Sequence, residues 1–385
     1  MLTRRQLAAW LAAAPGALRA DAPAVDSIRR RLPPSAPEGV ASIIANALAR
    51  TPASINTDWF GTLLTTGLLE WGRRGIPEAS TFARQWLAHH LDSREVAPYS
   101  GHGSRTVRAG GIPITTYCGH FGLGFPAFKI ARQFGDARAR QVCLDVASII
   151  LHQTARNRFG MVAHADNDDF VIPDTCFFTV VPLMMAAALD PQRGWPYREQ
   201  AVYQLRTNID VFLVRETGLA KTILLNSGQG KTYWTRASGW LMWAITGMLR
   251  YLPPGDRTFA GFVADLRILA GGVARAQGPS GALPLYLDQP GSPAETSGTA
   301  MCMMCMHEAI RRGWLPSTFN TFVDAGWKFV RDHIDSDGRI RGVYTGWAVP
   351  AEKGEILMDH VSMEWIPGLM LSAANEMTSE RGPQG

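Results

Sequence analysis

The sequence predicts an all-α protein, and three observations lead to this fold class. Helical patterns of apolar residues fill the chain, whereas the alternation typical of strands is scarce. Short turns rich in Gly and Pro recur along the chain at spacings of 60, 56, 63 and 59 residues. Each turn joins a helix that is apolar on all sides to a helix with a single apolar stripe. These turns lie at residues 75–77, 135–136, 190–194, 253–256 and 313–316.

This alternation predicts an inner and an outer layer, because a helix apolar on every side must be buried and a striped helix covers it. Six inner helices are expected to begin near Asn56, Gly119, Asp174, Arg236, Thr296 and His360. Six outer helices are expected to begin near Pro37, Pro77, Ala137, Pro196, Asp256 and Pro316.

A repeat of this length indicates stacked helical hairpins, which form either an open solenoid or a closed ring. The first outer helix, 37–50, has no preceding inner partner, and the last inner helix has no following outer one. Closing the ring would supply both partners. We therefore expect an (α/α)6 barrel over residues 37–377.

The composition excludes several classes of protein. The chain of 385 residues is 46% hydrophobic and only 18% charged, which argues against intrinsic disorder. Its formal charge of +5 includes no basic cluster of the kind that binds nucleic acid. No stretch of 18 apolar residues predicts a membrane span.

The first 22 residues are typical of an export signal. Arg4 and Arg5 precede a short apolar stretch, 7–14, and small residues follow around Ala20 and Ala22. The adjacent arginines favour the twin-arginine type of signal. We expect a bacterial protein that is exported to the periplasm or beyond; an amphipathic first helix is the alternative.

The sequence predicts neither a cofactor nor a metal ion. Cys302 and Cys305 form a C-x-x-C pair within an apolar helix, where core packing is favoured over a redox or metal pair because no second Cys/His pair accompanies it. The segment 228–232 lacks the first glycine of a phosphate loop. The acidic run 166–169 is similar to the D-x-D-D of some terpene cyclases, but alone it is a weak signal, and 335–338 lacks most calcium ligands.

Long connections run from each outer helix to the next inner one, near 92–118, 154–173, 215–234, 276–295 and 334–359. Loops of this length are usually functional or disordered. In a closed ring they all lie at one end, above the amino termini of the inner helices, and would wall a cup there. Free backbone N–H groups at these termini favour anions.

Three polar segments reach this cup. Asp174 enters a long apolar helix and is either an N-cap or an acid. The segment 234–240 carries Trp234, Arg236 and Trp240, which are suited to binding a carboxylate and stacking on sugar rings but equally to a Trp-rich core. The segment 295–298, Glu-Thr-Ser-Gly, is either a helix cap or a polar contact.

Taken in order, these segments resemble glycoside hydrolase families 88 and 105, the unsaturated uronyl hydrolases. The similarity is carried by the W-x-R-x-x-G-W segment at 234–240, the D-x-x-aromatic segment at 174–177 and the E-T-S-G segment at 295–298. It implies a six-hairpin toroid acting on 4,5-unsaturated glucuronyl or galacturonyl ends of oligosaccharides. It also implies that the double bond is hydrated, with one residue as acid and base.

The resemblance implies a role for each site residue. Asp174 would be catalytic, and the substrate would contact Trp59, His164, Trp234, Arg236, Trp240, Thr296 and Ser297. Two positions depart from the family pattern: 116–120 carries no carboxylate, and 221–227 carries no His. Two further hypotheses remain: an inverting glycosidase that pairs Asp174 with Glu295 or Glu364, and a glycan-binding barrel without turnover.

Overall fold

The computed structural model describes residues 20–93, 104–168, 170–225, 228–230, 232–344, 358–359 and 365–380. Most of the predicted export signal therefore lies outside the described residues, as do Asp169, His360 and Glu364. Within the described residues no helix is long and apolar enough to cross a membrane.

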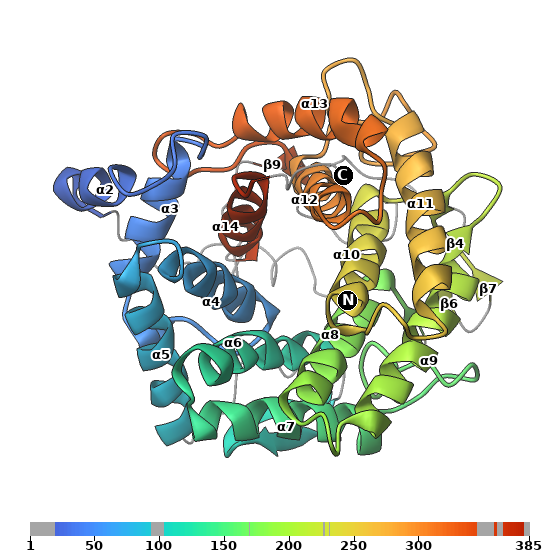
Figure 1. The fold of residues 1–385 in the computed structure, drawn as a ribbon, viewed down its shortest axis with the longest axis horizontal. Helices are drawn as coiled ribbons and strands as arrows, with labels where there is room; N and C mark the ends of the chain where they lie inside the picture. The colour runs from blue at the N-terminus through green and yellow to red at the C-terminus, as the bar shows by residue number, and fades with distance from the viewer. Residues whose placement is uncertain are drawn as a thin grey trace, which may run out of the picture.

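Six inner helices form a closed ring (Figure 1). Each packs against the next along the chain, and the last packs against the first, so the predicted closure is confirmed and an open solenoid is excluded. The six are α4 (Trp59–Gly72), α6 (Gly124–Phe134), α8 (Pro173–Leu189), α10 (Thr235–Tyr251), α12 (Thr296–Arg311) and α14 (Trp365–Met377).

Six outer helices surround this ring at the predicted places, with starts shifted by no more than a few residues. Sequence signals set several of these starts: Pro77 begins α5, and Asp136 caps α7 by accepting from the backbone N–H of Ala139 at 2.9 Å. They are α3 (Gly39–Leu48), α5 (Pro77–Asp92), α7 (Ala137–His152), α9 (Trp195–Phe212), α11 (Phe259–Arg275) and α13 (Asn320–Arg331). One helix, α2 (Ala22–Arg29), was not predicted, and it packs on α3.

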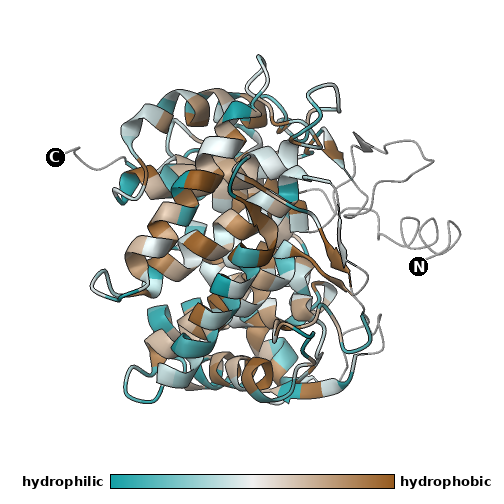
Figure 2. Cartoon of the chain, turned by 90° about the vertical axis from the view of Figure 1, so that its right-hand side faces the viewer, coloured by the Kyte–Doolittle hydropathy of each residue, from teal (hydrophilic) through white to brown (hydrophobic). Residues whose placement is uncertain are grey.

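The two layers differ in burial as their hydrophobic patterns predict. Every residue of α10 from Thr235 to Leu249 is buried, whereas α13 buries one stripe that includes Val323, Trp327 and Val330. Teal and brown residues accordingly alternate on the outer helices (Figure 2). The core is therefore the ring of inner helices together with the inward stripes of the outer ones.

Glycines close the seam between α14 and α4. A Cβ added to Gly368 would lie 2.4 Å from the backbone carbon of Leu63, and one added to Gly67 would lie 2.6 Å from the Cβ of Leu371. Across the same seam the indole N–H of Trp71 donates to the carbonyl of Leu371 at 3.0 Å. The two backbones meet this closely only because neither glycine has a side chain.

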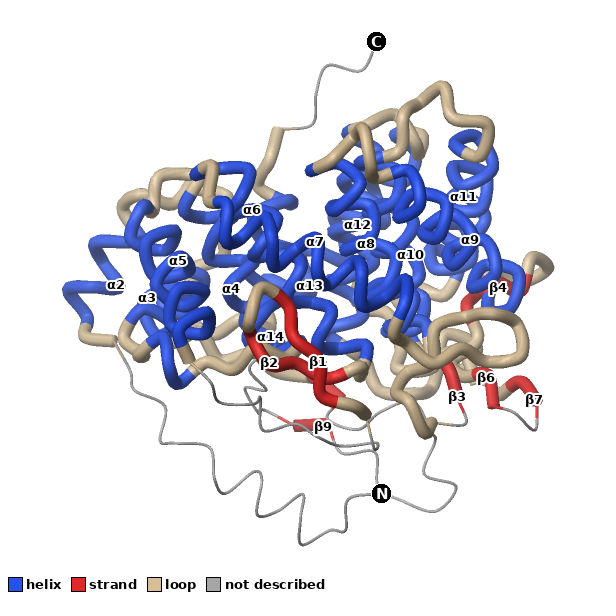
Figure 3. Tube along the Cα trace, turned by 90° about the horizontal axis from the view of Figure 1, so that it is seen from below, coloured by secondary structure: helices blue, strands red, loops and turns tan. Residues whose placement is uncertain are grey.

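Short strands occupy the long connections, and most of them lie at one end of the ring (Figure 3). All pairings are antiparallel: β1 with β2, β4 with β5, β8 with β9, and β6 with both β3 and β7. These hairpins were not predicted. They are β1 (Thr106–Ala109), β2 (Ile112–Thr115), β3 (Phe170–Val171), β4 (Leu213–Val214), β5 (Leu219–Ala220), β6 (Leu224–Leu225), β7 (Gly228–Gln229), β8 (Val343–Tyr344) and β9 (Met358–Asp359). The described residues also include three 3-10 turns: η1 (Pro52–Ser54), η3 (Cys118–Leu123) and η4 (Ser317–Phe319).

An aromatic layer crosses the ring in the amino-terminal half of the inner helices. Trp240 and Trp243 of α10 stack with an interplanar angle of 8°, and Phe177 of α8 stacks on Trp243 at 4.3 Å between ring centroids. Cys302 and Cys305 are buried free thiols of α12, so the predicted core packing is confirmed.

Candidate active site

Asp174 lies in the first turn of α8, one residue after the proline that begins the helix. It is not the N-cap, because Ile172 takes that position; its Oδ1 accepts instead from the backbone N–H of Thr175 at 2.6 Å. Burial raises the pKa of the Asp174 carboxyl above its ordinary value, although the nearby charges of His164 and Arg236 oppose this rise. The side chain is therefore suited to keeping and giving a proton.

His164 reaches Asp174 from the connection between α7 and α8. It is 5% exposed, and its ring packs edge-on against Tyr117 at 5.1 Å between centroids. Its Nδ1 pairs with the Oδ2 of Asp168 at 2.6 Å. Asp168 was not predicted as a site residue, although its place four residues after His164 in an acidic run was a signal that could have found it.

Arg236 lies in the first turn of α10, close enough to Asp174 for their charges to interact, and it is 4% exposed. Its Nη1 donates to the carbonyl of Tyr344 at 2.7 Å and to the Oγ of Ser297 at 3.4 Å. Burial lowers the pKa of Arg236 to about 10, against the effect of Glu295, Tyr344 and Asp174, so the guanidinium stays charged at neutral pH. The structure thus places Asp174, His164 and Arg236 close enough for their charges to interact.

Two indole rings flank the Arg236 guanidinium, Trp234 at 4.1 Å and Trp365 at 5.2 Å from the ring centroid. Both indole N–H groups are buried, and neither has a hydrogen-bond acceptor among the described residues. Buried donors normally have partners, so these two are open to an oxygen of a bound molecule. The sequence analysis missed Trp365, because this residue lies more than a hundred residues after the W-x-R segment.

Glu295 and the two hydroxyl residues after it form an internal cap. Glu295 is fully buried, and its carboxylate accepts from the backbone N–H groups of Ser297 and Gly298 at 3.3 and 2.5 Å. The hydroxyl of Ser297 donates to Glu295 at 2.6 Å, and that of Thr296 donates to the carbonyl of Arg341 at 2.7 Å. Thr296 and Ser297 are thus fully buried and their hydroxyl groups bond within the protein, while their predicted substrate contacts stay a prediction.

The predicted stacking residues divide into two kinds. Trp240 is 3% exposed and packs against Trp243, Phe177 and Phe178, so it belongs to the aromatic layer rather than to an open platform. Trp59 begins α4 and is only half-buried, with Trp365 at 5.1 Å between ring centroids. Of the two, only Trp59 keeps part of its ring exposed.

The segment 116–120 carries no carboxylate, but two carboxylates surround it. Burial raises the pKa of the Cys118 thiol well above its ordinary value, and both Asp174 and Asp168 raise it further. Asp168 therefore lies on the same side of the site as Asp174. His120, the polar residue of this segment, is fully buried; burial lowers its pKa to about 4, so it is neutral.

The remaining acidic motifs are held by local contacts. Asp166 accepts from the Nε of Arg105 at 3.0 Å and from the hydroxyl of Thr116 at 2.7 Å. Asp335 accepts from the Nε of Arg341 at 2.9 Å and from the turn N–H of Gly338. No group of three metal-ligating side chains occurs in the part of the chain that the structure describes.

Comparisons with known proteins place the chain in one family. The family model described as Glycosyl Hydrolase Family 88 matches residues 56–380. No protein among those with curated annotation matches the chain.

Several solved structures share the fold. One is a glycoside hydrolase from family 105 of C. acetobutylicum, with a TM-score of 0.72 and 12% identity, covering 88% of this chain and 99% of that one. Another is a glycosyl hydrolase of family 88 from Bacteroides vulgatus, with 0.68 and 17%, covering 89% and 99%. A third is the unsaturated glucuronyl hydrolase of Bacillus sp. GL1, with 0.61 and 18%, covering 84% and 87%.

Proposed function

The chain belongs to glycosyl hydrolase family 88 and is a glycosidase, and from this premise we propose that it removes 4,5-unsaturated glucuronyl or galacturonyl residues from the ends of oligosaccharides. One observation carries the proposal. A carboxyl group whose pKa is raised by burial, Asp174, stands at the amino end of an inner helix beside a buried guanidinium, Arg236. This arrangement suits proton transfer to a substrate that carries a negative charge.

The reaction needs one proton donor that becomes the base. The Asp174 carboxyl gives its proton to C4 of the double bond, and a water oxygen attaches to C5. The carboxylate takes the proton of that water, so Asp174 returns to its starting state. The hemiketal formed at C5 opens, the bond to the remaining saccharide breaks, and the shortened oligosaccharide leaves.

Arg236 would hold the substrate carboxylate. Its Nη1 donates to Tyr344 and Ser297 and lies 3.9 Å from Oε1 of Glu295, and the guanidinium carries five N–H donors in a planar fork that matches a carboxylate. The unpartnered indole N–H groups of Trp234 and Trp365 supply two further donors beside it. Trp59, whose ring is half-exposed, would stack on the sugar.

Asp168 would be a positioning residue that acts through His164. Its carboxylate accepts at Nδ1, which favours the tautomer with the proton on that nitrogen and leaves Nε2 for other contacts. It also places a second negative charge near the Cys118 segment, where a carboxylate is missing from the chain.

The two other hypotheses fit the geometry less well. An inverting glycosidase needs a second carboxylate that is free to activate water. Glu295 is fully buried and occupied by its capping contacts, and Glu364 lies outside the described residues. A glycan-binding barrel without turnover would have no need of an acid whose pKa burial has raised.

One assay separates the three functions. The protein is mixed with lyase-generated oligouronides, and the ultraviolet absorbance of the double bond is followed. Our proposal expects a decay that Asp174→Asn abolishes, with a loss of at least ~100-fold. New reducing ends from saturated glycans would instead support the inverting enzyme, and retention without turnover would support the binding protein.

We also propose that residues 1–22 direct export through the twin-arginine route. The paired arginines and the short apolar stretch support this. Expression of the full chain in a bacterial host, with and without Arg4→Lys and Arg5→Lys together, tests it. Equal amounts of periplasmic protein from both forms would contradict the proposal.

A further inference from the structure

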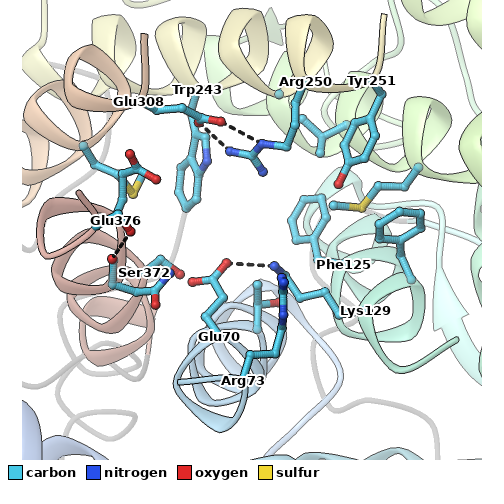
Figure 4. Close-up of a pocket in the computed structure, with 18 of the residues that line it drawn as sticks. Glu70, Arg73, Phe125, Lys129, Trp243, Arg250, Tyr251, Glu308, Ser372 and Glu376 are labelled. Carbon is cyan, nitrogen blue, oxygen red and sulfur yellow. Dashed lines mark hydrogen bonds and ion pairs between the residues drawn. The ribbon is translucent and has the colours of Figure 1, made fainter. Parts of the chain in front are cut away.

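A large cavity lies at the end of the ring opposite to Asp174 and Arg236. Its volume is about 720 Å³, within the range of small-molecule sites. The side chains around it come from the carboxyl-terminal parts of the inner helices, among them Glu70 of α4, Arg250 of α10 and Glu308 of α12 (Figure 4). We call this cavity the rear chamber.

Ion pairs form the wall of the rear chamber. Lys129 lies 2.8 Å from Glu70, and Arg250 contacts Glu308 through two nitrogens, at 2.9 and 2.5 Å. A third pair joins Arg311 to Glu376 through two contacts of 3.0 Å. Counted over all lining residues, seven Lys and Arg face three Glu, which leaves a net charge of 7 − 3 = +4.

Part of this polar lining has no partner in the protein. Arg73 and Arg132 are exposed at the chamber, and neither guanidinium has an ion pair or hydrogen bond with the described residues. The Oε2 of Glu70 and the Oε1 of Gln133 are buried acceptors without a donor among those residues. The chamber thus offers cations for a negative group and acceptors for hydroxyl groups.

The floor of the rear chamber is aromatic. Phe125, Phe177 and Trp243 line it, and they belong to the aromatic layer described above. These rings are only 2, 2 and 8% exposed and pack on one another, so they give the chamber an apolar base rather than open ring faces. An apolar base below a polar wall suits a sugar acid, whose ring has an apolar C–H side and polar substituents.

Helix electrostatics alone do not explain this lining. Cations are favourable at helix carboxyl termini, so the arginines could be there for the helices. The same rule disfavours carboxylates at these ends, yet Glu308 and Glu376 lie in the last turns of α12 and α14. This rule also does not account for the volume of the rear chamber or for its buried acceptors that have no donor among the described residues.

We propose that the rear chamber is a second ligand site and that it binds a sugar acid, a hydroxylated ring that carries a carboxylate. Arg73 and Arg132 pair with the carboxylate, Glu70 and Gln133 accept from hydroxyl groups, and the C–H side of the ring faces the apolar base. The site is separate from Asp174, and it does not depend on the function proposed for the cup.

Calorimetric titration of the full chain tests this proposal. Galacturonate and glucuronate are the probes, and glucose and inorganic sulfate are the comparison ligands. All proteins in this experiment carry Asp174→Asn, which prevents turnover. The chamber variant adds Arg73→Ala with Arg132→Ala, and the cup variant adds Arg236→Met. The matched control adds Arg193→Ala with Arg257→Ala. The control arginines are exposed on turns at the same end of the ring, outside the chamber.

The proposal expects saturable binding of a sugar acid that weakens at least tenfold in the chamber variant and persists in the other two. Thermal unfolding of each variant checks that the fold is intact. The proposal is overturned if no sugar acid binds, if only Arg236→Met removes binding, or if sulfate binds as tightly as the sugar acids. This binding measurement does not depend on the turnover of oligouronides. The proposal for the rear chamber can therefore fail without affecting the proposed function, and the reverse also holds.

Discussion

The carboxylate of Asp168 lies 2.6 Å from Nδ1 of His164, four residues earlier in the same buried connection. Because a charge-assisted hydrogen bond contributes about 1.5–3 kcal/mol, its loss should slow a step that depends on the orientation of His164. We expect Asp168→Asn to lower kcat by about 10- to 100-fold. Steady-state kinetics on unsaturated oligouronides would measure this.

Asp166→Asn is the matched control for Asp168→Asn, because Asp166 belongs to the same loop and pairs with Arg105 instead. We expect it to leave the shape of the pH profile unchanged, whereas Asp168→Asn should move it. Equal effects of the two substitutions would show that the loop, and not the His164 contact, matters.

Removing the charge of Arg236 should shift the pH dependence of turnover. Asp174 acts in its protonated form, so kcat/KM falls as the pH rises through its pKa. Arg236 opposes the rise of this pKa. In Arg236→Met the pKa of Asp174 therefore rises further, and the alkaline limb of kcat/KM should move to higher pH while KM increases. Arg236→Lys keeps the charge and should leave the limb in place; a limb that stays fixed in both variants would contradict this assignment.

Gly368→Ala should destabilise the closure of the ring. The new Cβ would meet the backbone of Leu63 at 2.4 Å, so α14 and α4 would have to separate. Overpacking of this kind costs about 1–3 kcal/mol in the free energy of unfolding. Urea denaturation would measure the change.

Gly271→Ala in α11 is the matched control, because its added Cβ meets only the end of Arg275 at 3.5 Å. Alanine is the better helix former, so this change should stabilise by about 0.5–1 kcal/mol. If neither substitution changed the free energy of unfolding, the close contact between α4 and α14 would contribute nothing to stability.

Glu308→Gln should remove part of the acid sensitivity of the fold. Glu308 is 3% exposed and pairs with Arg250 and Arg312, which lower its pKa below its ordinary value despite burial. Its ionised form stabilises the fold above the unfolded pKa of about 4.3, and this contribution is lost as the pH falls through the folded value.

The Glu308→Gln variant should be about 1–3 kcal/mol less stable at neutral pH, because the partly buried Arg250 loses its charged hydrogen-bond partner. Between neutral pH and pH 3 its free energy of unfolding should then fall less steeply than that of the parent protein. Parallel pH curves for the two proteins would show that this carboxylate does not titrate on unfolding.

The ring could be predicted from the sequence because its signals are periodic and local. Turns about sixty residues apart and the contrast between helices such as α10 and α13 identified both layers. The short hairpins could not be predicted, since strands of two to four residues in long connections leave no periodic pattern, and α2 is a helix of only eight residues.

The site was predictable only in part. The sequence indicated Asp174 and Arg236 because they lie at helix starts, and His164 because it lies in the connection before Asp174. Trp240 and Ser297 have sequence contexts that suit core packing and substrate contact equally. The rear chamber escaped prediction altogether. Its charged residues lie about sixty residues apart on different helices, and each alone is indistinguishable from an ordinary surface charge.

The seam between α4 and α14 sets the order of events during biosynthesis. Trp71 and Leu371 are separated by 300 residues, and their contact cannot form until the ribosome has made α14. Until then the apolar flank of α4 has no partner, a state that favours aggregation or chaperone binding. A transporter that accepts only folded proteins could move this chain only after α14 has docked on α4.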